Sequence, residues 1–154
     1  MTRSRESTRA RFMAGRLYQF DECDDRVAVA TIGRVDKTFL LIGALAGFLA
    51  VALGAFGAHA LRSRLSPEML AVFETGVRYH MYHALAIVLV ALIMGRMDGW
   101  LIQMSGWAFT IGLLLFPGSL YLLAFTGVTI FGAITPLGGL AFLIGWASLA
   151  IAAI

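Results

Sequence analysis

The C-terminal third of this sequence lacks charge. Between Gly99 and Ile154 there is no Asp, Glu, Lys, Arg or His. Charged side chains make up 14% of the whole chain, whereas a soluble domain of this size usually carries about 25%. A water-soluble fold could not cover its surface with such a segment, but a bilayer accepts it because helices satisfy their own backbone hydrogen bonds. The lack of charge therefore excludes a soluble domain for this part of the chain.

Cysteine and clustered basic residues are also scarce. The single cysteine, Cys23, excludes an intrachain disulfide and a multi-cysteine metal site. Seven of the twelve basic residues precede Val35, and no basic stripe is interleaved with aromatic residues, so we expect no nucleic-acid partner. The hydrophobic part also lacks a Ser-His-Asp pattern, a phosphate-binding loop and a pair of catalytic carboxylates. These absences predict a protein that is not an enzyme and has no cofactor and no metal.

Residues 1–36 are polar and carry charges of both signs, unlike the rest of the chain. A segment of this composition cannot bury enough apolar area to offset the entropy of ordering it. We therefore expect a disordered tail over 1–36 and a membrane domain over 37–154. The Arg-rich, acid-poor start also resembles an organelle transit peptide, but the acidic cluster at 21–25 argues against extending that interpretation.

Long hydrophobic runs are abundant, since 60% of the residues are hydrophobic. A helix needs ~20 predominantly apolar residues to cross a bilayer. Four segments come close to or exceed that length, at about 38–61, 79–94, 100–126 and 136–154. The pattern predicts an all-α bundle of four transmembrane helices. Pro117 falls within the third segment, where it removes one helical hydrogen bond, so we expect a kink there.

A short amphipathic helix is predicted between the first two spans. Ser66 is a suitable N-cap, Pro67 suits the first helical position, and Glu68 favours the positive end of a helix. Apolar residues then recur at helical spacing, with Glu74 and Arg78 on another face. We expect this segment to lie at the membrane surface and to lead into the second span.

Small residues recur every three or four positions along the first and last spans. Gly43, Gly47 and Gly54 share one stripe of the first span, and Gly145 belongs to a similar stripe in the last. Small residues let helix backbones approach closely, so we expect these glycines to mediate packing within the bundle. A leucine at Gly47 or Gly54 should then destabilise the protein. Because Gly43 and Gly47 form a GxxxG motif, self-association of two copies is the alternative.

Ionisable side chains of the hydrophobic part gather around the first two spans. His80 and His83 are three residues apart and share a helix face. Glu74 and Arg78 precede them, and His59 ends the first span. We expect His59 or His80 to contact this cluster across the helix interface, at one end of the membrane. Three interpretations stay open: ligands for a metal, a relay for protons, or residues that anchor helix ends at the interface.

Four stretches of the hydrophobic part are distinctive. They are GAFGAHAL at 54–61, FETGVRYHMYHA at 73–84, LFPGSLY at 115–121 and ITPLGG at 134–139. Over about residues 37–154 they resemble the small membrane-protein family that includes bacterial YgdD and eukaryotic transmembrane protein 256. The resemblance implies four membrane helices and supplies no catalytic residues, because the family is labelled a domain of unknown function. Members usually begin close to the first span, so translation from Val35 is a further hypothesis.

These observations favour a non-enzymatic structural or accessory membrane component. We expect its partners to be the lipid bilayer and other membrane proteins, or a second copy of itself, and its location to be the bacterial inner (plasma) membrane. The alternative is a small channel or carrier for protons or a small solute that uses the histidine-rich end. A metal-dependent membrane enzyme is the third hypothesis. The excess of Lys and Arg before the first span places both termini in the cytoplasm, whereas a start at Val35 weakly reverses that orientation.

Overall fold

The computed structural model describes residues 35–97 and 99–154, and these residues are helical over most of their length. Their helices are α2 (Lys37–Phe56), the short π-helix η1 (Gly57–Leu61), α3 (Pro67–Ile93), α4 (Trp100–Thr126) and α5 (Ile130–Ala152). The continuous segment Lys37–Leu61 and the other three long helices are each long and apolar enough to cross a membrane. The prediction of an all-α fold with four transmembrane helices is confirmed. The predicted tail lies almost entirely outside the described residues.

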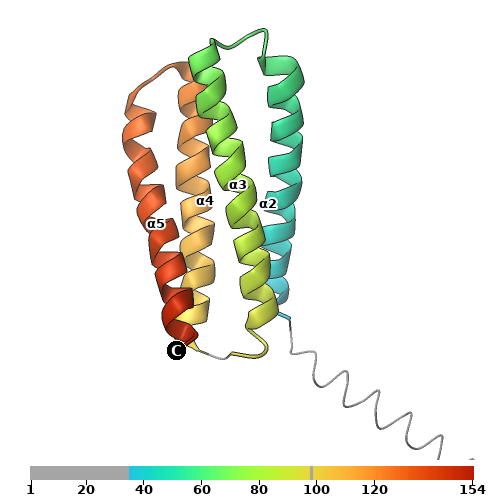
Figure 1. Cartoon of the computed structure of the whole chain (residues 1–154), viewed down its shortest axis with the longest axis vertical. Helices are drawn as coiled ribbons and strands as arrows, with labels where there is room; N and C mark the ends of the chain where they lie inside the picture. The colour runs from blue at the N-terminus through green and yellow to red at the C-terminus, as the bar shows by residue number, and fades with distance from the viewer. Residues whose placement is uncertain (1–34, 98) are drawn as a thin grey trace, which may run out of the picture. The chain divides into compact units, whose positions relative to one another are not determined.

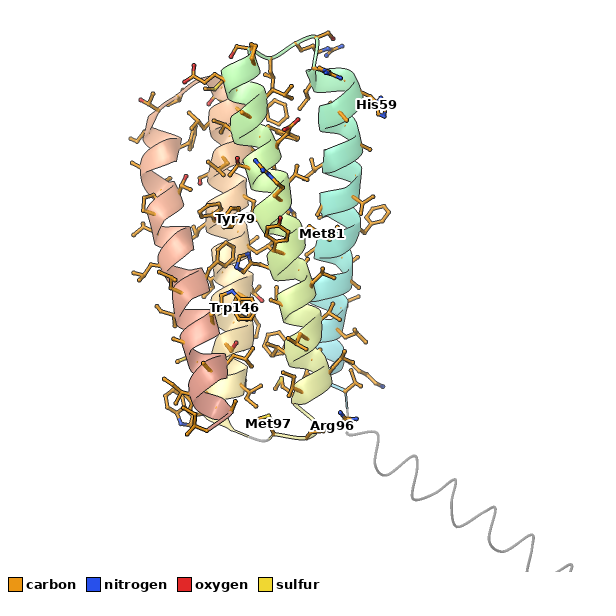
Figure 2. All side chains as sticks on the ribbon, in the orientation of Figure 1. His59, Tyr79, Met81, Arg96, Met97 and Trp146 are labelled. Carbon is orange, nitrogen blue, oxygen red and sulfur yellow. The ribbon has the colours of Figure 1, made fainter. Side chains whose placement is uncertain are left out.

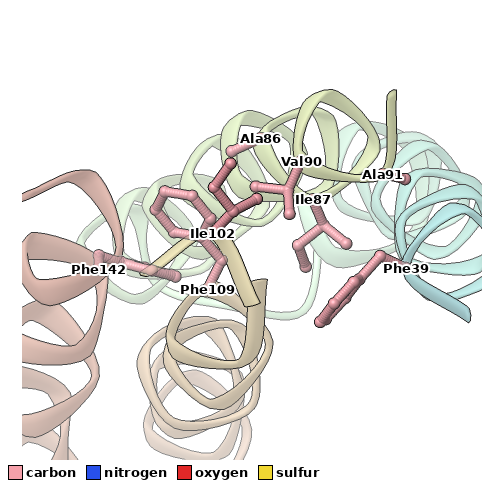
Figure 3. Close-up of a cluster of buried hydrophobic side chains, with 8 residues drawn as sticks. All are labelled: Phe39, Ala86, Ile87, Val90, Ala91, Ile102, Phe109 and Phe142. Carbon is pink, nitrogen blue, oxygen red and sulfur yellow. The ribbon is translucent and has the colours of Figure 1, made fainter. Parts of the chain in front are cut away.

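The four long helices run alternately up and down and lie side by side in chain order (Figure 1). Accordingly, α2 packs on α3, α3 on α4, and α4 on α5. Figure 3 shows α2 and α5 on opposite sides of the α3–α4 pair, so these two helices form the edges of the bundle. Their outer faces carry large exposed apolar side chains, such as Phe48 and Leu143, which suit contact with lipid.

Local sequence chemistry sets several helix ends. The Asp36 carboxylate accepts a hydrogen bond of 2.9 Å from the backbone N–H of Phe39 and caps α2. Ser66 caps α3 in the same way at 3.2 Å, with Pro67 in the first helical position, as the sequence predicts. Gly127 ends α4 with a φ of 70°, a conformation that glycine adopts without steric cost.

The segment predicted as a separate surface helix is part of the second span. α3 is continuous over Pro67–Ile93 and is about 39 Å long at 1.5 Å per residue. Gly76 does not interrupt it, because the missing side chain makes room for a neighbouring helix. Tyr121 of α4 comes within 2.8 Å of the position that a Cβ on Gly76 would take. The N-terminal part of α3 is therefore packed on α4 and belongs to the span.

Two prolines lie inside the last two helices. α5 begins at Ile130, ahead of Pro136, where the sequence predicts the start of the last span. Its first turns pack on the end of α4, where Leu123 lies 3.5 Å from the Cβ position of Gly132. Pro117 is fully buried inside α4, which is helical on both sides of it. The kink at Pro117 stays a prediction.

The four glycines predicted to mediate packing differ in their surroundings. A Cβ on Gly43 would lie 2.7 Å from a valine of α3, and one on Gly145 would lie 2.6 Å from a phenylalanine ring of α4. At Gly54 the nearest atom, on another valine of α3, is 3.3 Å away. At Gly47 no described atom lies within 4 Å, so the prediction of packing within the bundle is wrong there. The reason is that each four-residue step turns the stripe about 40° around the helix.

The buried apolar residues form two clusters along the bundle. The larger lies towards the end where α2 begins and joins all four long helices (Figure 3); its members are Phe39, Ala86, Ile87, Val90, Ala91, Ile102, Phe109 and Phe142. The smaller, made of Leu61, Phe73 and Ala124, lies at the opposite end. His83 of α3 contacts Phe109 and Phe142 of the larger cluster, and His80 contacts Tyr121, which packs against the smaller one.

Candidate functional site

The five polar residues predicted to form one cluster lie in three places. His59 is exposed on η1 and points away from α3 (Figure 2). His80 and His83 are buried, with exposed fractions of 6% and 5%. Glu74 and Arg78 are exposed on another face of α3. Among the described residues no hydrogen bond joins His59 to the other four, so the predicted network across the helix interface is not formed.

The histidines also differ in depth. Counted along α3 from Pro67, His80 lies about 20 Å and His83 about 24 Å along a helix of roughly 39 Å. The hydrocarbon core of a bilayer is ~30 Å thick, so both rings lie within it. The prediction that all three histidines share one membrane end is therefore wrong. The physical reason is the continuity of α3, which carries residues 80 and 83 to its middle.

His83 is held on both ring nitrogens. Its Nδ1–H donates to the backbone carbonyl of Tyr79 at 2.9 Å, and the indole N–H of Trp146 donates to its Nε2 at 3.4 Å. Since Nε2 accepts a hydrogen bond, the ring is neutral and its proton is on Nδ1. The imidazole also stacks on Phe142, with centroids 3.3 Å apart and planes inclined by 6°. His83 thereby ties α3 to α5.

Aromatic rings from three helices surround His83. Tyr79 lies parallel to it on α3, and Phe109 of α4 and Phe142 and Trp146 of α5 also pair with it. Phe116 of α4 completes the group by contacting Tyr79 and Phe142. Phe109 also meets Trp146 edge to face at 5.0 Å. Figure 2 places Tyr79 and Trp146 midway along the bundle. We call these five side chains the aromatic box.

His80 makes one polar contact, to a different helix. Its Nδ1 lies 3.2 Å from the hydroxyl of Tyr121 on α4. Its Nε2 is buried and has no hydrogen-bond partner among the described residues. Sequence reasoning missed Tyr121 and Trp146 as partners of the histidines. They lie 41 and 63 residues away in the chain, and a single sequence carries no signal for such pairs.

Glu74 and Arg78 do not pair through their charges. The Nε–H of Arg78 donates to the backbone carbonyl of Glu74 at 3.4 Å, and another guanidinium N–H donates to the hydroxyl of Thr75 at 3.2 Å. Both bonds stay within α3. Over residues 35–97 and 99–154, no group of three or more His, Cys, Asp and Glu side chains is placed to hold a metal ion.

Comparison with known proteins gives a family. A family model described as "Protein of unknown function (DUF423)" matches residues 53–139. The "UPF0382 membrane protein YwdK" of Bacillus subtilis is 47% identical over 119 residues, which are 77% of this chain and 97% of that relative. A "UPF0382 membrane protein" of Haemophilus influenzae is 48% identical over 113 residues, 73% of this chain and 90% of the relative.

No solved structure matches the chain. The matched residues 53–139 include η1, all of α3 and α4, and the start of α5. They therefore contain Glu74, Arg78 and the buried histidines of α3. The chain belongs to the DUF423/UPF0382 family of membrane proteins, a family of unknown function.

Proposed function

We propose that this chain is a non-enzymatic structural or accessory component of the bacterial inner (plasma) membrane. The observation that carries the proposal is the environment of His83. Both of its ring nitrogens are engaged, one within α3 and one by Trp146 of α5, and its face is covered by Phe142. A side chain used in this way stabilises helix packing and has no nitrogen left for proton transfer or for a metal.

The distribution of charge supports the same proposal. A driven carrier places ionisable groups in the bundle interior along the path of its substrate. Here Glu74 and Arg78 are exposed, and α4 and α5 contain no charged residue. Interior polar side chains such as His80 with Tyr121, and Ser119 with Thr135 at 2.8 Å, instead join helices. These features support a structural role in preference to a channel or carrier.

The proposal also includes the wider family, the location of the protein and the bounds of its membrane domain. The four sequence stretches at 54–61, 73–84, 115–121 and 134–139 support grouping YgdD and transmembrane protein 256 with this chain. The bacterial relatives support the inner membrane as its location. Residues 37–154 form the membrane unit of the protein in this proposal, with residues 1–36 as a separate tail.

The test is partner capture from native membranes. The full chain, carrying a photo-crosslinker at exposed Phe48 or at exposed Leu143, is crosslinked in membranes and purified, and its adducts are identified by mass spectrometry. We expect the same membrane protein to be captured from one edge of the bundle and not from the other. A matched control carries the crosslinker at buried Ile87, where no intermolecular adduct should form.

A second measurement tests the carrier hypothesis directly. Purified protein in proteoliposomes should conduct protons no faster than empty liposomes. Proton flux that His80→Phe removes, in a variant that still melts cooperatively, would overturn the proposal in favour of a channel or carrier. Absence of any reproducible adduct at both edges would also contradict an accessory role.

A further inference from the structure

A groove runs between η1 and α3 on the outside of the bundle. Its volume is about 240 Å³. One wall is made of small residues of α2 and η1, and the other is made of α3 side chains; the full lining is Gly54, Gly57, Ala58, Phe73, Glu74, Val77 and Arg78. The groove is therefore mostly apolar and contains one positive and one negative side chain.

The charged residues of the groove are costly where they lie. Glu74 and Arg78 are about 10 Å and 16 Å along α3 from Pro67, inside a helix that spans the membrane. Ionisable residues within transmembrane segments almost always face the bundle interior, and both of these face outwards. Neither hydrogen bond of Arg78 reaches a carboxylate. Such residues call for a partner outside the described chain.

The guanidinium of Arg78 is directed towards the membrane surface. Its two hydrogen bonds go to Glu74 and Thr75, which lie closer to the start of α3. Long basic side chains in membrane helices bend in this way to bring the charge to the headgroup level. The remaining guanidinium N–H groups are available to an oxygen ligand in the groove, and a phosphate is one of the two ligands, with carboxylate, that an arginine fork matches.

The order of the two charges selects the ligand. The Glu74 backbone is one helical turn closer to the start of α3 than that of Arg78, whose guanidinium bends back as far as Thr75. Side chains of a helix lean towards its N-terminus, so the Glu74 carboxylate extends further towards the membrane surface than the guanidinium. In a phospholipid the phosphate is attached to the glycerol that carries the acyl chains, and the amine of a zwitterionic headgroup lies beyond the phosphate, further from those chains. We infer that the groove binds an amine-bearing zwitterionic phospholipid, with its phosphate on Arg78 and its ammonium on Glu74. This inference does not depend on the proposed accessory role.

The small residues of α2 and η1 explain why a lipid fits here. Gly54 and Ala58 leave the groove open on one side, whereas Gly57 is buried against Phe73. The π-helix widens the turn that carries Gly57 and Ala58. Further along α2, a Cβ on Gly47 would enter open space. An acyl chain can extend from the groove along α2, past Gly47, towards the middle of the bilayer. Gly47 then leaves room for a lipid, in place of the helix contact that the sequence suggested.

The test is lipid retention by the full-length protein in native mass spectrometry. Purified protein is titrated with phosphatidylethanolamine, phosphatidylcholine or phosphatidylglycerol of identical acyl chains. We expect phosphatidylethanolamine to be retained best, and Arg78→Gln to lower its retention about tenfold, the loss expected for one charge-assisted hydrogen-bonded contact. Glu74→Gln should abolish the preference over phosphatidylglycerol, because only the amine contact is removed.

Matched variants separate the groove from general charge effects. Arg64→Gln and Glu68→Gln alter the same membrane end outside the groove lining and should leave retention unchanged. Ala58→Leu fills the groove without touching either charge and should lower retention as Arg78→Gln does. The melting temperature in detergent reports whether Arg78→Gln folds. If it does not fold, Ala58→Leu still tests the groove.

Two results would overturn the inference. One is equal retention of the three lipids, or retention that neither Arg78→Gln nor Ala58→Leu changes. The other is a dimer that dissociates in both of these variants, which would assign the groove to a second copy of the chain.

Discussion

The two helix pairs of this bundle are built differently. α4 and α5 touch along their length over glycines, since a Cβ on Gly112, Gly138 or Gly145 would collide with a phenylalanine of the opposite helix. α2 touches α3 closely at Gly43, and η1 touches it at Gly57, where a Cβ would lie 2.8 Å from the Phe73 ring, but a groove lined by both elements lies on the outside beside η1. The charges follow the same division, because α4 and α5 have none and α3 has Glu74 and Arg78 beside the groove.

This difference distinguishes a helix pair that serves packing alone from a pair that also carries an outer groove. Without a hydrophobic driving force between helices in lipid, close backbone approach and polar contacts hold a bundle together. The α4–α5 pair uses both, with glycine contacts and the Ser119–Thr135 hydrogen bond. The α2–α3 pair also has close contacts, but it carries the outer groove beside η1 where we propose that a phospholipid binds. Substitutions of the same kind in both helix pairs test this difference.

The largest effect is expected at the closest contact of the α4–α5 pair. In Gly138→Ala the new Cβ would lie 2.8 Å from the Cα of Phe116, and backbone atoms cannot rotate away. We expect a loss of about 3 kcal/mol in the free energy of unfolding, measured by denaturation in mixed detergent micelles. The control is Gly118→Ala, whose Cβ would meet no atom within 4 Å and which should cause no loss. Equal losses in the two variants would contradict a glycine-mediated interface.

The Gly43 contact of the α2–α3 pair should come next. Gly43→Ala brings a Cβ to 2.7 Å from the side chain of Val88 and 2.9 Å from its backbone nitrogen. We expect it to lower the free energy of unfolding by about 2 kcal/mol. Gly47→Ala, one helical turn along α2, faces open space and should stabilise the helix slightly because alanine favours helical backbone. A comparable loss at both positions would mean that a second molecule packs on α2.

The link between the two pairs should have a smaller effect. Trp146→Phe removes the indole N–H that donates to His83 and keeps an aromatic ring in the box. We expect a loss of about 1 kcal/mol in unfolding free energy, because the buried Nε2 is left without its donor. Trp100→Phe is the control, since that side chain is 70% exposed. No difference between the two tryptophans would show that the aromatic contacts alone hold His83.

The smallest effect is expected for the hydroxyl pair. Ser119→Ala removes the 2.8 Å hydrogen bond to Thr135 and should cost about 0.6 kcal/mol, the average for hydrogen bonds between membrane helices. A double-mutant cycle with Thr135→Val isolates the coupling between the two side chains. A coupling energy of zero would mean that the α4–α5 pair is held by its glycine contacts without help from this bond.

Some of this molecule was predictable because it follows from local composition. Four apolar runs predict four spans, and the Ser66–Pro67 start of α3 follows from capping chemistry. The residues Glu74, Arg78, His80 and His83 were found because ionisable groups are rare in such a chain. Their arrangement was not predictable. His80 and Arg78 are two residues apart, yet one is buried against Tyr121 and the other lines an outer groove.

By itself, the sequence determined that residues 37–154 enter a membrane as four helices, because a bilayer accepts apolar side chains and satisfied backbones and little else. Only the tertiary structure decided which face of each helix meets a neighbour. In it α3 is one long helix, packed on Tyr121 at Gly76, and His80 and His83 lie in its interior instead of at a membrane end. The rotation of α2 turned Gly43 inwards and Gly47 outwards. These arrangements depend on contacts between residues that are far apart in the sequence, and hydropathy carries no information about such contacts.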